Sequence, residues 1–220
     1  NLPSDVEEYG TTGDLVEEIA QFIHNNCEVP TFFEKLLPHV MLFYWVYERF
    51  PFIPYLHFVG GTGTGKTTAM ETLGSISYKS IDTTGSLTIA SLFRVATTWR
   101  GTLLIDEFDH VSDNSSEIIS FLKSGVSNRI ILRTEGDVKR EVKAYIVKSP
   151  KMFTSENPID DAGLQSRTMV VRMQKNKRRL PLYKLSEYHE QAEHIRNKLL
   201  LWRLRNLNTI SLKEIKYGFP

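Results

Sequence analysis

The chain has 220 residues, of which 41% are hydrophobic and 24% are charged, and its 27 lysines and arginines nearly balance its 26 aspartates and glutamates. This length suits one domain, or one domain with a small appendage, and the composition excludes disordered and fibrous proteins. The net charge of +1 does not by itself indicate a nucleic-acid partner, so any contact with DNA has to come from local clusters of basic residues.

The single cysteine, Cys27, excludes an internal disulfide and fits a reducing compartment. The longest apolar stretch, residues 40–47, falls far short of the ~20 residues that a membrane-spanning helix needs. We therefore expect a cytoplasmic protein without membrane contact.

Apolar periodicity and turn residues predict helices and strands that alternate along the chain. Residues 1–35 contain a helical pattern around residues 15–23, which Thr12 or Asp14 could cap. An aromatic helix is expected over residues 36–50. Further strands are predicted at residues 55–59, 79–81, 101–105, 150–155 and 169–173, and further helices at residues 67–73, 86–98, 115–123 and 182–207. This alternation indicates an α/β fold with three layers, αβα, around a parallel central sheet.

A glycine-rich segment follows the strand predicted at residues 55–59. It reads Gly60, Gly61, Thr62, Gly63, Thr64, Gly65, Lys66, Thr67 and Thr68. Residues 60–67 match the pattern G-x-x-x-x-G-K-[ST], with an apolar strand before it and a helix after it. Glycines let backbone amides turn towards phosphate oxygens, Lys66 is expected to reach the β- and γ-phosphates, and the Thr67 hydroxyl is expected to bind Mg²⁺. The segment therefore predicts a site for ATP and Mg²⁺.

Two carboxylates, Asp106 and Glu107, end the buried strand predicted at residues 101–105. Asp106 suits a second Mg²⁺ contact, through water, and Glu107 suits the base that polarises an attacking water molecule. Behind a complete phosphate-binding loop, these acids favour hydrolysis over nucleotide sensing. The nearby Asp109 is expected to cap a helix or to lie on the surface.

With these motifs, residues 36–200 resemble the AAA+ ATPases, a class of P-loop NTPases. Residues 152–158 are similar to the sensor 1 strand of that family. The resemblance implies that Asn157 is the polar residue beside the γ-phosphate, or Ser155 or Thr154 if the register differs. The alternative is that Asn157 is only a turn residue before Pro158.

The segment Leu164-Gln165-Ser166-Arg167 is similar to the L-x-S-R motif of the same family. The resemblance implies that Arg167 acts as a finger on the nucleotide of a neighbouring subunit, in a homo-oligomeric ring that we expect to be a hexamer. The alternative for Arg167 is a surface salt bridge. The resemblance thus implies catalytic roles for Lys66, Asp106, Glu107, Asn157 and Arg167.

Two narrower resemblances concern particular AAA+ branches. The Asn157-Pro158 step followed by the L-x-S-R motif is similar to MCM-type helicases. The sequence Leu92-Phe93-Arg94, together with residues 160–167, resembles the helicase-like ATPases that phages, plasmids and mobile elements encode beside primases. A zinc ribbon like that of full MCM proteins is excluded because Cys27 is alone.

A β-hairpin is predicted between the two acids and the sensor strand, because residues 129–134 and 141–147 flank the turn Glu135-Gly136-Asp137. Its basic residues are Arg129, Arg133, Lys139, Arg140, Lys143 and Lys148. MCM and superfamily 3-type helicases carry a basic hairpin here, so the resemblance implies that Lys139, Arg140 and Lys143 contact nucleic acid. An ordinary solvated hairpin is an equally good interpretation. The basic residues 175–179 are expected to form a solvated loop, and the alternative is that they contact nucleic acid.

We expect a helical extension at residues 1–35, an AAA+ core at residues 36–175 and a C-terminal helical lid or tail at residues 176–220. The lid arginine that the family calls sensor 2 could be Arg196, Arg203 or Arg205. The function that these patterns favour is an ATP-driven DNA helicase or translocase of a replication or mobile-element system, acting on single-stranded or forked DNA with a primase as partner. The alternative is a non-motor AAA+ remodeller or loader-like switch acting on proteins, whose pore loops would carry an aromatic residue such as Phe93 or Trp99.

Overall fold

The computed structural model of the chain describes residues 1–83, 88–108, 115–135, 141–180 and 185–211. Its centre is a five-stranded sheet in which every paired neighbour is parallel, in the order β2-β3-β6-β1-β7. The strands are β1 (Tyr55–Val59), β2 (Ile81–Asp82), β3 (Leu103–Ile105), β6 (Lys151–Ser155) and β7 (Thr168–Arg172). All residues of β1, β3 and β6 are buried, as expected for central strands covered on both faces.

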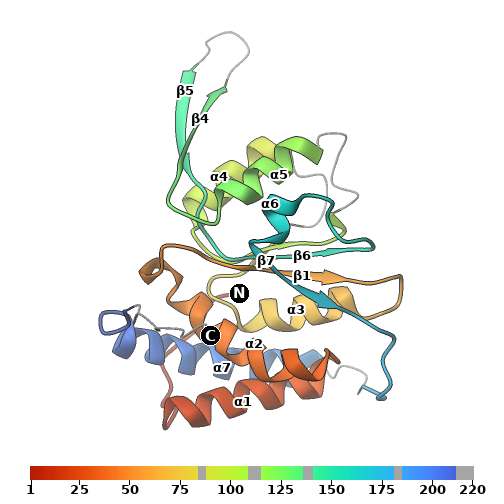
Figure 1. The fold of residues 1–220 in the computed structure, drawn as a ribbon. Coiled ribbons are helices and arrows are strands. Elements are labelled where there is room, and N and C mark those ends of the chain that lie inside the picture. Colours follow the sequence, from red (N-terminus) through yellow and green to blue (C-terminus); the bar gives the residue numbers. More distant parts are fainter. Residues whose placement is uncertain (84–87, 109–114, 136–140, 181–184, 212–220) are drawn as a thin grey trace, which may run out of the picture.

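The helices cover both faces of this sheet (Figure 1). They are α1 (Thr12–Asn26), α2 (Thr31–Trp45), α3 (Lys66–Ile76), α4 (Ile89–Trp99), α5 (Ser115–Ser124), α6 (Ala162–Gln165) and α7 (Leu185–Asn206), with a short 3-10 turn at Tyr47–Arg49. Within the described residues, the expected mixed α/β fold with a parallel central sheet is confirmed.

Alternation along the strands divides the apolar side chains into two cores. Leu56 and Phe58 of β1 join the larger core, which α1, α2, α3 and α7 cover. Tyr55 of the same strand joins the smaller core, under α4 and α5. The first and last long helices therefore share one core with the helix that follows the phosphate-binding loop, while the domain boundaries at residues 35 and 175 remain a prediction.

Two helix starts differ from the sequence-based expectation. Thr11, rather than Thr12 or Asp14, caps α1: its hydroxyl accepts from the Asp14 amide, and the Asp14 carboxylate accepts from the Thr11 amide in return. Helix α2 begins at Thr31, directly after Pro30, whereas the predicted start at residue 36 placed Pro38 in the first turn, where proline is favoured.

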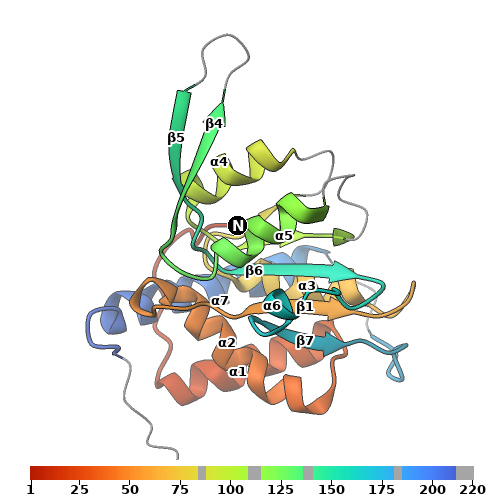
Figure 2. The ribbon, with the colours of Figure 1, turned by 45° about the horizontal axis from the view of Figure 1, so that its top comes forward.

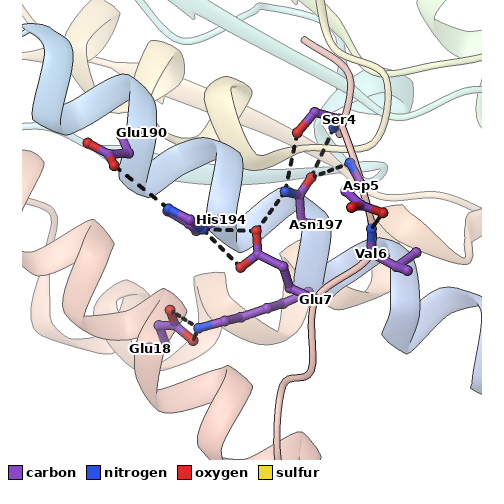
Figure 3. Close-up of polar contacts among 9 residues, drawn as sticks. Ser4, Asp5, Val6, Glu7, Glu18, Glu190, His194 and Asn197 are labelled. Carbon is purple, nitrogen blue, oxygen red and sulfur yellow. Dashed lines mark hydrogen bonds and ion pairs between the residues drawn. The ribbon is translucent and has the colours of Figure 1, made fainter.

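Residues 4–7 run along α7 and are fixed to it by polar contacts (Figure 3). The Asn197 amide oxygen accepts from the backbone amides of Ser4 and Asp5, at 3.0 and 3.3 Å. The Glu7 carboxylate contacts the Asn197 amide nitrogen at 2.7 Å and His194 at 2.9 Å, and these partners hold the pKa of Glu7 below its usual range. The N-terminal and C-terminal parts of the described chain are therefore joined by side chains as well as by the shared core.

Strands β4 (Ile130–Glu135) and β5 (Glu141–Ile146) form a separate two-stranded antiparallel sheet that stands away from the body (Figures 1 and 2). On one face Tyr145 is buried against Phe93 of α4, with ring centroids 5.6 Å apart, and Arg133 lies over the same ring at 4.5 Å. On the opposite face Ile130, Leu132 and Val142 are each about two-thirds exposed. The ribbon is thus anchored through one face and presents an apolar face to solvent.

Candidate nucleotide site

The phosphate-binding loop, residues 60–67, joins the buried strand β1 to helix α3. Gly63 and Gly65 take φ angles of 75° and 79°, a left-handed conformation that glycine adopts without strain. Lys66 folds back over the loop, where its ammonium group donates to the carbonyls of Gly60 and, at 3.2 Å, Gly61. The loop therefore has the turns and the cation that a bound phosphate chain needs.

A cavity of about 270 Å³ opens over this loop. Its lining comes from three parts of the chain, namely residues 62–68 of the loop and α3, Glu107 after β3, and residues 154–156 at the end of β6. Because the strands are parallel, their carboxyl ends meet at one edge of the sheet, and the loop after β1 lies at that edge as well. The fold thus brings together Lys66, Thr67, Thr68 and Glu107, which sequence analysis had placed at the site.

Thr67 and Asp106 face one another, with the Thr67 hydroxyl 3.1 and 3.2 Å from the two carboxylate oxygens of Asp106. A hydroxyl and a carboxylate are hard oxygen donors of the kind that Mg²⁺ prefers. Negative charge gathers near Asp106. Burial raises the pKa of Glu71 on α3, and the negative charges of Asp82 and Asp106 raise it further. The residues present therefore fit a divalent cation held by Thr67 and Asp106.

Thr154 connects the two acids, whereas its place in the sequence indicates only an alternative to Asn157. Its fully buried hydroxyl donates to the Asp106 carboxylate at 2.5 Å and accepts from the backbone amide of Glu107 at 2.9 Å. Glu107 itself takes a φ of 48°, an unusual value for a residue other than glycine. Thr154 thus fixes both Asp106 and the backbone turn from which the Glu107 side chain reaches the cavity.

Asn157 lies beyond the end of β6, is exposed and is not among the described residues that line the cavity. Thr154 and Ser155 do line it, and the Ser155 hydroxyl donates to the Asn157 carbonyl and lies 2.6 Å from the buried His57 ring. The polar group that the fold places beside the cavity is therefore the Thr154–Ser155 pair, and a role for Asn157 remains a prediction.

Arg167 lies at the other edge of the sheet. Its backbone carbonyl accepts from the amide of Tyr55, the first residue of β1, whereas the phosphate-binding loop follows Val59 at the end of that strand. Four residue steps along a strand separate the two positions by about 13 Å. The half-buried guanidinium donates to the Gly163 carbonyl of its own chain. Arg167 therefore does not line the cavity of its own chain, and a role for it at the site of another copy remains a prediction.

The three lid-arginine candidates on α7 are all engaged elsewhere. Arg196 donates to the carbonyls of Ser75 and Leu2, at 2.7 and 3.1 Å. Arg203 pairs with Glu48 at 2.7 Å, and Arg205 pairs with Glu8 at 2.6 Å. Among the described residues, none of these arginines lines the cavity, and each instead joins α7 to the N-terminal part of the chain.

The basic residues predicted along the hairpin separate into three groups. Lys139 and Arg140 lie outside the described residues, as does Asp109. Lys143 is exposed on β5, and Arg129 is exposed just before β4. Lys148 is buried, with its ammonium group donating to the Phe50 carbonyl at 2.6 Å, and Arg133 ion-pairs with Glu117 at 3.6 Å. Lys148 is therefore not one of the solvated basic residues of the hairpin, because its charged group is used inside the fold.

Comparison with known proteins shows similarity in structure alone. No family model matches the sequence, and no curated protein matches it. The apo C-terminal region of NrS-1 aligns with a TM-score of 0.51 at 14% identity, over 90% of this chain and 46% of that one. JCV helicase with a bound small molecule aligns with a TM-score of 0.49 at 14% identity, over 86% of this chain and 55% of that one.

The chain thus spans about half the length of each of these two structures. The likeness to the NrS-1 region agrees with a P-loop-like core. No helix within the described ranges is long and apolar enough to cross a bilayer.

Proposed function

We propose that this chain is an ATP-hydrolysing AAA+ motor domain that acts on DNA as a helicase or translocase. The observation that carries the proposal is the convergence of Lys66, Thr67 and Glu107 at one cavity, with Asp106 in contact with Thr67, while Arg167 lies at the opposite edge of the sheet. The site contains Lys66 and the two acids of its own chain, but Arg167 of the same chain cannot reach it. Such a site is suited to ATP hydrolysis at an interface between subunits.

In the proposed reaction Lys66 leaves the carbonyls of Gly60 and Gly61 and binds the β- and γ-phosphates. Glu107 orients a water molecule and accepts its proton as the water attacks the γ-phosphorus. The bond from that phosphorus to the oxygen bridging the β- and γ-phosphates breaks, so ADP and inorganic phosphate are released. Thr67 and Asp106 would hold Mg²⁺, which supplies charge neutralisation at the phosphates when bound. Arg167 of a neighbouring copy stabilises the charge of the transition state, in a ring proposed to be a hexamer.

The DNA part of the proposal is supported by the sequence resemblance to MCM and superfamily 3-type helicases and by the basic hairpin residues Lys139, Arg140 and Lys143. Lys143 lies on a ribbon that projects from the body, where it could reach a strand threaded past the domain. A primase partner rests on the sequence resemblance alone.

One observation favours the alternative, a non-motor AAA+ switch that acts on proteins. The face of the hairpin that meets solvent carries Ile130, Leu132 and Val142, which suit an apolar protein surface better than a phosphate backbone. The aromatic residues expected for this alternative do not support it, since Phe93 is buried and the Trp99 indole donates to the Lys79 carbonyl.

The test is the rate of ATP hydrolysis with Mg²⁺, measured with and without single-stranded DNA, for the wild type, Lys66→Ala and the surface control Lys35→Ala. The proposal predicts that DNA stimulates the wild type and Lys35→Ala, and that Lys66→Ala neither binds nor hydrolyses ATP. Hydrolysis that is indifferent to DNA would support the switch instead. Hydrolysis by Lys66→Ala at the wild-type rate would overturn the assigned site.

A further inference from the structure

His57, on the central strand β1, is a polar side chain in an apolar part of the core. It is 1% exposed, and alternation along the strand puts it on the same face as Tyr55 of the smaller core. Its ring stacks against Phe153 of the neighbouring strand β6, with ring centroids 4.5 Å apart. Burying an imidazole costs free energy unless its nitrogens are hydrogen-bonded, so the hydrogen bond that the ring makes is of interest.

The hydrogen bond between His57 and Ser155 has a defined direction. His57 Nε2 lies 2.6 Å from Ser155 Oγ, which in turn lies 2.5 Å from the carbonyl oxygen of Asn157. A carbonyl only accepts, so the single hydroxyl proton of Ser155 is donated to Asn157. The Ser155 oxygen then accepts from His57, and Nε2 carries the proton of this bond. Residues 155–157, which we call the wall, are thus bonded to the core through His57.

The wall borders the candidate nucleotide cavity and is joined to the phosphate-binding loop. Ser155 and Glu156 of the wall both line the cavity. The Ser155 carbonyl accepts from the Gly60 amide at 3.3 Å, and the Glu156 carboxylate accepts from the Thr62 hydroxyl at 2.9 Å. The wall is therefore held on one side by the loop and on the other by the buried ring of His57.

The wall also follows directly after Thr154, the residue that links the two acids. The Thr154 hydroxyl bonds the Asp106 carboxylate and the Glu107 amide. Because Thr154 and Ser155 are consecutive in one strand, a shift of Ser155 displaces the Thr154 hydroxyl as well. The position of Glu107 therefore depends on the hydrogen bond that His57 donates.

We propose that His57 is a positioning residue for ATP hydrolysis, because its Nε2–H group fixes Ser155 and, with it, the wall and Glu107. His57 is not among the described residues that line the cavity, so it acts through Ser155 and not on the nucleotide. This inference rests on the proposed function, since it takes hydrolysis at this site as given.

The test is steady-state ATP hydrolysis with Mg²⁺ by the wild type, His57→Phe, Ser155→Ala and the variant that combines both. The loss of one neutral hydrogen bond corresponds to roughly 3- to 10-fold. We expect each single substitution to lower the rate at saturating ATP by at least such a factor. Because His57 acts through Ser155, the double variant should be no slower than Ser155→Ala alone. His57→Gln, which keeps an N–H donor, should restore part of the rate.

NMR of the histidine ring nitrogens gives a readout that does not depend on activity. Long-range ¹H–¹⁵N spectra distinguish a protonated from an unprotonated ring nitrogen. The proposal predicts a proton on Nε2 of His57, with a resonance that shifts in Ser155→Ala. The matched control is His39→Phe, the same substitution at an exposed histidine, which should keep the wild-type rate.

Two results would overturn the inference. One is an unprotonated Nε2, and the other is a double variant in which His57→Phe slows Ser155→Ala as much as it slows the wild type, because His57 then only fills the core. If His57→Phe does not fold, a wild-type rate in Ser155→Ala would overturn the inference in the same way. Absence of hydrolysis by the wild type would instead overturn the proposed function, and this failure is distinguishable because the Nε2 proton is measured without nucleotide.

Discussion

Thr154 is the residue that links the two acids of the site, through one hydrogen bond to Asp106 and one from the Glu107 amide. Thr154→Val keeps the shape of the side chain but leaves both partners without this bond. We expect the rate of hydrolysis at saturating ATP to fall about tenfold or more, because Glu107 loses its fixed position, while ATP affinity without Mg²⁺ is retained.

The control for this prediction is Thr154→Ser, which keeps the hydroxyl and should restore most of the rate. Steady-state kinetics of the wild type, Thr154→Val and Thr154→Ser measure the rate of hydrolysis at saturating ATP. Equal rates for the valine and wild-type proteins would show that the Thr154 hydroxyl is not needed to position Glu107.

Away from the site, the buried side chain of Lys151 lowers the stability of the fold. It is fully buried at the start of β6, with its ammonium group donating to the carbonyls of Val147 and Ser149 at 2.9 and 3.1 Å. Burial lowers the pKa of Lys151 from 10.5 to about 7. Between these values the unfolded chain holds more protons than the folded one, so the free energy of unfolding rises with pH over this window.

The amount by which Lys151 destabilises the folded state should therefore decrease by about 2 kcal/mol between pH 7 and pH 9. Urea unfolding of wild type and Lys151→Met at pH 7, 8 and 9 measures it. The stability of the wild type should rise relative to that of the variant as pH increases. Parallel pH profiles would mean that the folded-state pKa of Lys151 is not depressed.

At the scale of elements, the strands and helices of the core could be predicted because their apolar periods and flanking glycines are local. The predicted strand at residues 55–59 coincides with β1, and the acids after residue 105 do follow β3. The helix expected at residues 67–73 extends over Lys66–Ile76, because Gly65 ends the loop in a left-handed turn and the buried side chains continue to Ile76.

Contacts between distant segments could not be predicted in this way. Thr154 reaches Asp106 only because β6 pairs with β3, and Asn176 reaches Gly65 only because β7 pairs with β1. Lys148 and Lys151 look like solvated basic residues in the sequence, yet both are buried by the packing at the start of β6. These contacts and burials follow from the order of the strands in the sheet, and a short stretch of sequence does not predict that order.

The hairpin is the element that decides between DNA and protein as the substrate. If its basic residues contact DNA, the combined substitutions Lys139→Ala, Arg140→Ala and Lys143→Ala should weaken binding of single-stranded DNA. The slope of log affinity against log salt should decrease by roughly 0.7 for each lost phosphate contact. Fluorescence anisotropy over a range of salt concentrations measures both quantities.

The matched variant for the other face of the ribbon is Leu132→Ser with Val142→Ser, which removes exposed apolar groups and leaves the charges in place. DNA affinity should be unchanged in this variant. If the basic variant binds DNA like the wild type while the serine variant loses a protein partner, the hairpin belongs to the switch alternative.

At the scale of the whole molecule, the proposed role of Arg167 requires a second chain to complete the site. The cavity over residues 62–68 and Arg167 lie at opposite edges of one sheet, so a single chain has Lys66 and the two acids at this place but not Arg167. Specific ATPase activity should therefore rise with protein concentration as subunits associate. An arginine finger contributes ~10³- to 10⁵-fold in rate, so Arg167→Ala should be nearly inactive while it still binds ATP.

The measurement that tests this account most directly is ATP hydrolysis by a mixture of Arg167→Ala and Glu107→Gln subunits, each inactive alone. At a mixed interface, the first variant supplies an intact Glu107 and Lys66, and the second supplies an intact Arg167. We predict that activity reappears on mixing and increases with the concentration of the mixture. Activity of Arg167→Ala close to that of the wild type, with no dependence on concentration, would contradict a site shared between subunits.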